Sequence, residues 1–200
     1  MDRSLDLQVI ETVERHPAVR RVRLVGSRAA GNATAVSDWD FAVETDDFEA
    51  VAGDIGALLA RFEPLAQQWD RLSETRCWMA ILPGPVKLDF IFAELHMPQP
   101  PWCPERSNLI AVDDHFWDWA LWLRSKQARN QGELVGKELG KMFEHVLHPM
   151  GVDVPPPSLD AAVASYLIAR DRLERDFSVA VPRTLGQAVV RAIRSREERQ

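Results

Sequence analysis

The sequence predicts an α+β protein in which a mixed β-sheet flanked by helices precedes a bundle of helices. In the first half, short apolar segments typical of strands alternate with segments of helical periodicity. In the second half, only helical spacing recurs. Pro98, Pro100, Pro101 and Pro104 crowd the stretch between them, which excludes a regular helix or a central strand there. We therefore expect a sheet domain over 1–97, a proline-rich linker over 98–112 and a helical domain over 113–200.

Each element of the first half follows from the spacing of its apolar residues. Leu5, Val9 and Val13 fall on one helical face ahead of Pro17, so the first helix is expected over 5–16. A short strand over 22–25, a helical turn over 27–32, a strand over 39–43 and a helix over 48–62 follow. Two strands, over 77–82 and 86–92, are joined by a Pro-Gly-Pro turn signal.

The second half predicts four helices, over 116–129, 132–147, 159–177 and 185–196. Three consecutive prolines at 155–157 separate the second from the third. Trp117, Trp119 and Trp122 of the first helix could stack on a base or a sugar ring, but packing in a helical core is the favoured interpretation.

Composition narrows the class of protein. The 200 residues are 46% hydrophobic and 27% charged, as in soluble globular proteins. The net charge of −6 argues against a duplex nucleic-acid partner, which favours a basic face. Cys77 and Cys103 form no C-x-x-C pattern, so neither a disulfide framework nor a structural zinc site is expected. The sequence shows no signal-peptide layout and no long apolar run, so we expect a cytoplasmic protein without a membrane span.

Three aspartates stand within or beside apolar segments. Side chains alternate between the two faces of a strand, so Asp38 and Asp40 are expected on one face and Trp39 and Phe41 on the other. Asp89 has apolar neighbours on both sides. If the two strands are adjacent, the three acids meet, although two carboxylates about 6 Å apart repel by roughly 3 kcal/mol at an effective dielectric near 20. A bound cation would relieve this repulsion, and hard oxygen ligands favour Mg²⁺ or Mn²⁺.

The Gly26-Ser27 pair follows an apolar run and predicts a phosphate contact. A glycine at a strand end lets phosphate approach the backbone, and the N–H groups that open the next helix attract anions. The Ser27 hydroxyl can donate to a phosphate oxygen, and Arg28 adds positive charge. The spacing of a P-loop is absent.

These residues resemble the nucleotidyltransferase superfamily that includes DNA polymerase beta. Its signature is an apolar-Gly-Ser start, then a D-x-D, then a third acid on a later strand, matched here by Gly26, Ser27, Asp38, Asp40 and Asp89. The motifs G-S-R-A-A-G and S-D-W-D are similar to those of small bacterial nucleotidyltransferases. The resemblance covers residues 20–92 and implies that the three acids hold Mg²⁺ while the Gly-Ser loop binds a nucleoside triphosphate.

The helical half is similar to the helical domain of streptomycin-type aminoglycoside adenylyltransferases, which has an aromatic-rich helix and then a G-K-x-x-G-K-like stretch. Lys137 and Lys141 could reach a triphosphate tail, although a solvated helix face explains them equally well. The resemblance also implies a general base from this half, for which Glu138 and Glu144 are candidates. Asp89 is an alternative base. The chain is shorter than members of the streptomycin group.

The expected function is metal-dependent transfer of a nucleoside monophosphate, with AMP from ATP favoured, to a hydroxyl of a small molecule. An aminoglycoside-like antibiotic is the favoured acceptor, and the acidic run at 44–49 could attract such a cation or cap the next helix. Two alternatives stay open. One is an antitoxin that transfers AMP to a partner toxin protein, and the other is a nucleotide-binding module without catalysis.

Overall fold

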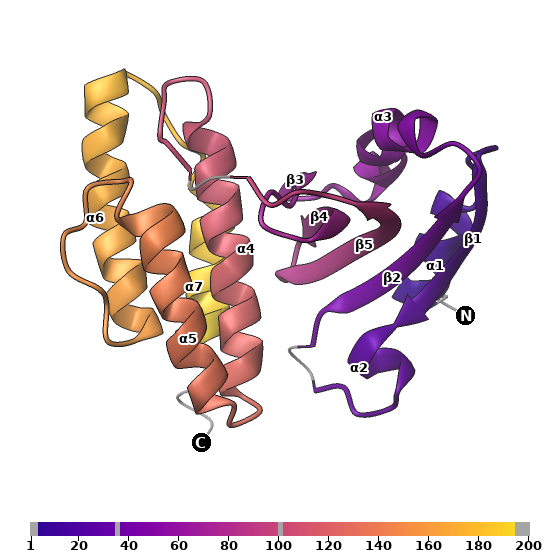
Figure 1. Ribbon diagram of the computed structural model, residues 1–200, viewed down its shortest axis with the longest axis horizontal. Coiled ribbons are helices and arrows are strands. Elements are labelled where there is room, and N and C mark those ends of the chain that lie inside the picture. Colours follow the sequence, from indigo (N-terminus) through magenta and orange to yellow (C-terminus); the bar gives the residue numbers. More distant parts are fainter. Residues whose placement is uncertain (1–3, 35–36, 100–101, 195–200) are drawn as a thin grey trace. The chain divides into compact units, whose positions relative to one another are not determined.

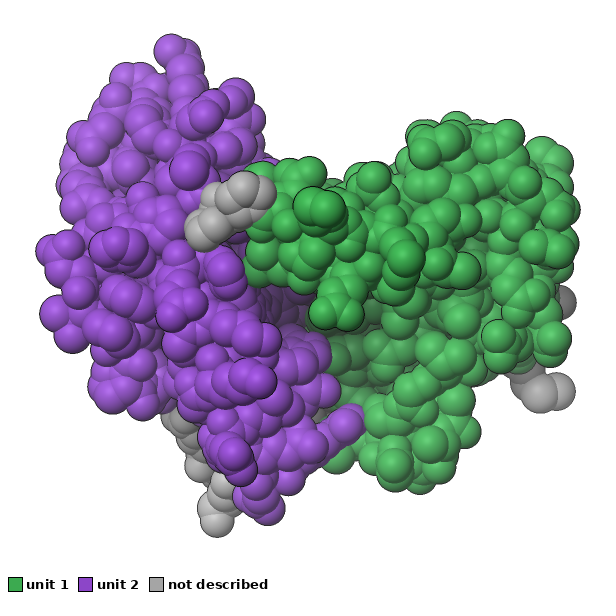
Figure 2. Space-filling view, viewed as in Figure 1, with its two compact units in different colours: residues 1–99 green, residues 100–200 purple. Residues whose placement is uncertain are grey.

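The computed structural model describes residues 4–34, 37–99 and 102–194. The chain divides into two compact units, residues 1–99 and 100–200, drawn in green and purple in Figure 2. The first unit is built on a sheet and the second consists of helices, so the α+β class predicted from the sequence is confirmed. Among the described residues, no helix has the length and apolar character needed to cross a membrane.

The first unit contains a five-stranded sheet with the strand order β1-β2-β5-β4-β3 (Figure 1). Its strands are β1 (Val19–Val25), β2 (Trp39–Thr45), β3 (Ala66–Trp69), β4 (Thr75–Leu82) and β5 (Val86–Leu95). Strands β2 and β5 pair in parallel, and the other neighbours pair antiparallel. The sheet is therefore mixed, and its parallel pair brings together the two segments that carry the predicted acids.

One face of this sheet forms the core of the first unit. Phe41 of β2 and Phe90 of β5 are fully buried there, and their rings stack with centroids 5.3 Å apart. Helices α1 (Leu5–Val13) and α3 (Phe48–Leu59) contribute apolar side chains to the same cluster. Because side chains alternate along a strand, the residues next to Phe41 on β2 and next to Phe90 on β5 lie on the opposite face of the sheet.

Strand β3 was not expected from the sequence. It has only four residues, two of them the glutamines Gln67 and Gln68, so it lacks the apolar alternation that predicts a strand. It lies at the edge of the sheet and pairs with β4, where Trp69 is opposite Trp78 and the two rings meet edge to face. The contact between Trp69 and Trp78 stabilises the pairing of β3 with β4. A contact between two strands cannot be predicted from the order of polar and apolar residues within one of them.

The acidic run between β2 and α3 has structural partners. Asp47 is the N-cap of α3 and accepts a hydrogen bond from the Ala50 N–H, as expected of a capping residue. Glu44 lies 3.1 Å from Arg23, and Asp46 lies 3.0 Å from Arg20. The capping interpretation is confirmed for Asp47, and two of the four acids of the run, Glu44 and Asp46, are paired with arginines.

The second unit consists of α4 (Leu109–Gln127), α5 (Gly132–Met142), a π-helical turn (Phe143–Leu147), α6 (Leu159–Phe177) and α7 (Thr184–Arg194). Helix α4 begins earlier than the periodicity predicted, since Leu109 and Val112 are buried and extend its apolar face. The predicted helix over 132–147 changes to π geometry in its last turn. The expected end of the last helix, at 195–196, lies outside the described residues.

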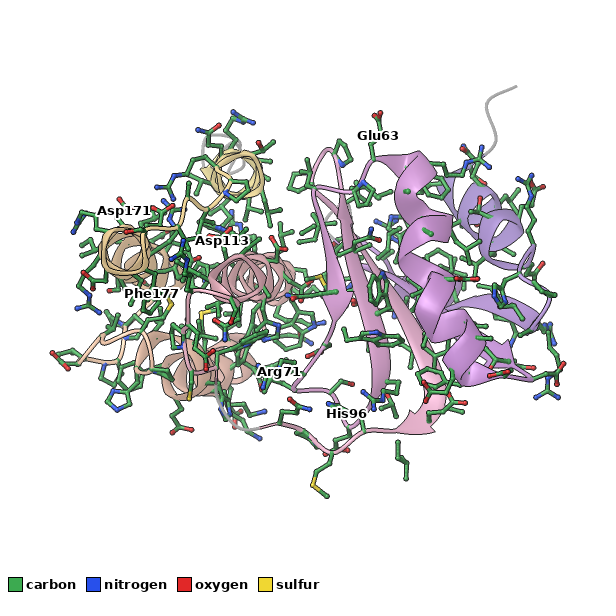
Figure 3. All side chains as sticks on the ribbon, turned by 90° about the horizontal axis from the view of Figure 1, so that it is seen from above. Glu63, Arg71, His96, Asp113, Asp171 and Phe177 are labelled. Carbon is green, nitrogen blue, oxygen red and sulfur yellow. The ribbon has the colours of Figure 1, made fainter. Side chains whose placement is uncertain are left out.

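A polar network lies inside the second unit. Asp113 of α4, labelled in Figure 3, accepts hydrogen bonds from the Tyr166 hydroxyl of α6 and from Trp117 Nε1 at 3.1 Å. Arg170 of α6 lies 3.7 Å from the same carboxylate. Trp117 is fully buried in this network, which agrees with its expected role in the core. Burial raises the pKa of Asp113, and burial together with the Asp113 charge raises the pKa of Asp114 to about 7.

Candidate functional site

Asp40 and Asp89 lie side by side on the two parallel strands. They occupy the same register position of β2 and β5, directly beside the paired aromatics Phe41 and Phe90. Partners in register share a face, so both carboxylates lie on the side of the sheet opposite the apolar core. The sequence analysis made the meeting of the acids conditional on adjacent strands, and β2 and β5 are adjacent, with Asp40 and Asp89 in register.

Asp38 precedes β2 and is 8% exposed. The segment that carries it is held by Arg28, whose Nε donates to the Ser37 and Asp38 carbonyl oxygens, each at 3.1 Å. The Arg28 guanidinium also lies over the Trp39 ring, 3.9 Å from its centroid. Burial lowers the pKa of Arg28, while the charges of Asp38 and Asp40 act in the opposite direction. Arg28 therefore lies within the electrostatic field of both acids.

These contacts add to the expectation for Arg28. The sequence suggested only that the charge of Arg28 could reach a phosphate. In the structure, the Arg28 guanidinium also forms hydrogen bonds that connect α2 (Gly26–Ala29) to the backbone before β2. A planar group that donates to two carbonyl groups and stacks on an indole restricts the position of the chain there. Nucleotide binding by Arg28 stays a prediction.

Gly26 lies against the Asp40 carboxylate. It has φ +65°, and a Cβ placed on it would overlap Asp40 Oδ2. Glycine is therefore required both by the backbone conformation and by the close approach of the acid. Helix α2 has only four residues, so its peptide dipoles sum to less than those of a full helix, and the expected attraction of the helix end for phosphate is correspondingly smaller.

Lys87 forms an ion pair that the sequence analysis did not identify. Its Nζ lies 2.6 Å from Asp89 Oδ1, and the two side chains are 7% and 14% exposed. The signal was present in the sequence, because residues two apart in a strand share a face and V-K-L-D places Lys87 beside Asp89. A buried cation thus already accompanies one of the three predicted metal ligands.

The described part of the chain contains no group of three or more His, Cys, Asp or Glu side chains arranged to hold a metal ion. The three aspartates are therefore not gathered into a finished metal site, and one oxygen of Asp89 accepts from Lys87. The donor set still suits Mg²⁺ or Mn²⁺, since it consists of carboxylate oxygens, and those of Asp40 and Asp89 share one face of the sheet. The backbone of Gly26 lies directly against the Asp40 carboxylate, where an added Cβ would overlap it. The residues fit a hard divalent cation.

The four candidates of the helical half belong to the second unit. Lys137 is exposed, whereas Lys141 lies 2.7 Å from Glu138 in an i, i+3 ion pair. The carboxylate of Glu138 is 13% exposed, and Glu144 is exposed on the π-helical turn. Their expected roles toward a triphosphate or an acceptor proton stay predictions.

Comparison with known proteins gives the following results. No family model matches the chain. No curated protein matches it. The polymerase core of TRAMP, an RNA surveillance complex, is similar in structure with 14% identity and a TM-score of 0.37, over 64% of this chain and 44% of that chain. This chain thus spans less than half the length of that polymerase chain.

A second solved structure, an aminoglycoside 6-adenyltransferase from Bacillus subtilis, has 11% identity and a TM-score of 0.37. The similarity covers 97% of this chain and 98% of that chain.

Proposed function

We propose that this protein is a metal-dependent nucleotidyltransferase that moves a nucleoside monophosphate from a triphosphate to a hydroxyl group. The observation that carries the proposal is the placement of Asp40 and Asp89 at one register position of two parallel strands, with Gly26 against Asp40. Asp38, Asp40 and Asp89 carry three negative charges against the two positive charges of Lys87 and Arg28, so a further cation would still be attracted. Gly26 lies directly against Asp40, so a phosphate bound at the Gly26-Ser27 turn would be close to a cation held by Asp40.

Each residue has a part in this chemistry. Asp38, Asp40 and Asp89 would hold Mg²⁺ or Mn²⁺, which supplies charge stabilisation for in-line displacement at phosphorus when bound. Ser27 would donate its hydroxyl to a phosphate oxygen, and Gly26 would admit the phosphate without a steric clash. Arg28 keeps the segment before β2, which carries Asp38, in place.

The transfer takes place in one displacement at the α-phosphorus, in which one bond forms and one breaks. The acceptor oxygen forms a bond to the α-phosphorus, the bond from that phosphorus to the bridging oxygen breaks, and pyrophosphate leaves. The acceptor gives up its hydroxyl proton to a carboxylate. Asp89 is the candidate base in the first unit, and Glu138 or Glu144 is the candidate in the second. ATP is the proposed donor.

The proposed acceptor is a small molecule with a hydroxyl group, and an aminoglycoside-like antibiotic is favoured by the sequence resemblance of the helical half. The arginine-paired acids at 44–46 give no added support for a cationic acceptor. The acceptor class therefore depends on the resemblance alone.

The test is incubation with ATP labelled at the α-phosphorus, Mg²⁺ and a panel of hydroxyl acceptors, with pyrophosphate measured in parallel. Wild type should form a labelled small-molecule adduct, and Asp40→Asn should form none. Label on a co-expressed protein would favour an antitoxin that modifies its partner. Calorimetric binding of Mg-ATP without pyrophosphate release would favour a non-catalytic module, and no binding at all would refute the proposal.

A further inference from the structure

We propose that Lys87 is a positioning residue that serves as an internal counter-ion of Asp89 and makes tight binding of a divalent cation depend on the nucleotide. This inference rests on the proposed function. In it, the ammonium group holds the Asp89 carboxylate until a cation, accompanied by a triphosphate, takes over that oxygen. Lys87 would thereby weaken binding of the bare cation without touching the substrate.

The position of Lys87 supports this role. It lies two residues before Asp89 on β5, on the same face, and its Nζ is 2.6 Å from Asp89 Oδ1. Across the sheet, Lys87 is paired with Ile81 and Asp89 with Met79, and both partners are almost completely buried. The ion pair thus has apolar neighbours on the adjacent strand. In such surroundings a charge needs a partner, and the attraction within the pair is stronger than at an exposed surface.

The charge balance of this face explains why a cation is needed there. Asp40 lies at the register position beside Asp89, so two carboxylates share one part of the face. Lys87 pairs with Asp89, and Arg28 interacts with the charges of Asp38 and Asp40, so these three acids and two basic groups leave one net negative charge. An arriving divalent cation is attracted by this net charge but repelled by Lys87, and it must compete with Nζ for Asp89 Oδ1.

A nucleoside triphosphate changes this balance because it brings several negative charges of its own. These charges attract the cation and offset the repulsion between the cation and Lys87. The cation and the nucleotide should therefore bind cooperatively, and Lys87 should be the source of part of that cooperativity.

The experiment measures Mn²⁺ binding by the electron paramagnetic resonance signal of free Mn²⁺, with and without a non-hydrolysable ATP analogue. Lys87→Met removes the charge and keeps an unbranched side chain of similar length. It should tighten Mn²⁺ binding without nucleotide by about tenfold, equal to about 1.4 kcal/mol, and reduce the gain produced by the analogue. Lys87→Arg keeps the charge and should stay close to wild type.

Lys126→Met is the matched control, because it makes the same substitution at a lysine of the second unit, whose ammonium group lies 4.7 Å from the centroid of the Trp122 ring. It should leave Mn²⁺ affinity unchanged. An unchanged or weaker Mn²⁺ affinity in folded Lys87→Met protein overturns the inference, and so does a protein that binds no Mn²⁺. If neither Lys87→Met nor Lys87→Gln folds while Lys87→Arg does, the pair is purely structural and the inference is wrong.

The outcomes separate this inference from the proposed function. Wild type that binds Mn²⁺ as described but labels no acceptor would refute the transferase proposal and leave the role of Lys87 intact. If wild type transfers nucleotide but Lys87→Met leaves the Mn²⁺ affinity unchanged, the role of Lys87 is refuted and the transferase proposal is kept.

Discussion

Gly26 and Asp40 are in direct contact: a methyl group on the α-carbon of Gly26 would overlap the Asp40 carboxylate. The glycine comes directly after β1, and the aspartate lies on the neighbouring strand β2. The contact therefore links the predicted phosphate-binding turn to one of the predicted metal ligands. It also means that the two motifs cannot be altered independently.

Gly26→Ala should abolish transferase activity and lower the free energy of unfolding by about 2 kcal/mol, since it combines a positive φ with a steric overlap. Gly31→Ala is the control, because Gly31 has φ +71° with nothing within 4 Å of its added Cβ. It should show only the backbone cost, about 1 kcal/mol, and keep activity. Chemical denaturation and the labelled-ATP assay measure both effects. Equal loss of activity in the two variants would show that the contact with Asp40 is unimportant.

Asp89→Asn should destabilise the protein far more than Asp40→Asn. It removes the carboxylate that balances the buried Lys87 ammonium, and breaking one side of a buried ion pair costs about 3 kcal/mol. The double variant Lys87→Met with Asp89→Asn should recover much of this loss, as urea denaturation would show. If Asp89→Asn is as stable as Asp40→Asn, the ion pair contributes little to folding.

Arg28→Lys should reduce activity although it keeps the charge. Lysine cannot donate to the Ser37 and Asp38 carbonyl oxygens as a planar fork while stacking on Trp39. We expect a loss of stability of about 1 kcal/mol and faster hydrogen exchange in the segment before β2. Arg23→Lys, at an exposed ion pair with Glu44, should change stability by less than about 0.5 kcal/mol. Unchanged exchange in Arg28→Lys would contradict the positioning role.

Asp114 should make stability fall as the pH rises from 5 to 8. Its pKa is raised from 3.8 to about 7 in the folded protein, so the folded state holds the proton more tightly than the unfolded state. This stabilisation is complete below pH 3.8 and disappears as the pH passes 7. Relative to Asp114→Asn, wild type should lose about 2–3 kcal/mol over pH 5 to 8.

Denaturation at several pH values measures this difference. Asp153→Asn alters an exposed carboxylate of the same unit and serves as the control, with the pH dependence expected to match wild type. A pH dependence that survives Asp114→Asn unchanged would assign it to other groups, such as Asp113, whose pKa is also raised by burial.

Local patterns predicted most of the fold and the face on which Asp40 and Asp89 lie. Alternation in W-D-F-A-V placed Asp40 opposite Phe41, and helical periodicity located α3 and α6 closely. The parallel pairing of β2 and β5 could only be stated as a condition, because it joins segments far apart in the chain. Strand β3 was missed because its glutamines carry no apolar pattern. The partners of Arg28 were missed because they depend on a turn of the chain that sequence spacing does not describe.

A crystal soaked with Mn²⁺ and a non-hydrolysable ATP analogue tests the central claim most directly, because the anomalous signal of Mn²⁺ locates the ion. We predict a peak coordinated by Asp40 and Asp89, with the phosphate groups beside Gly26 and Ser27. A peak remote from these two carboxylates, or an analogue bound elsewhere on the protein, would contradict it.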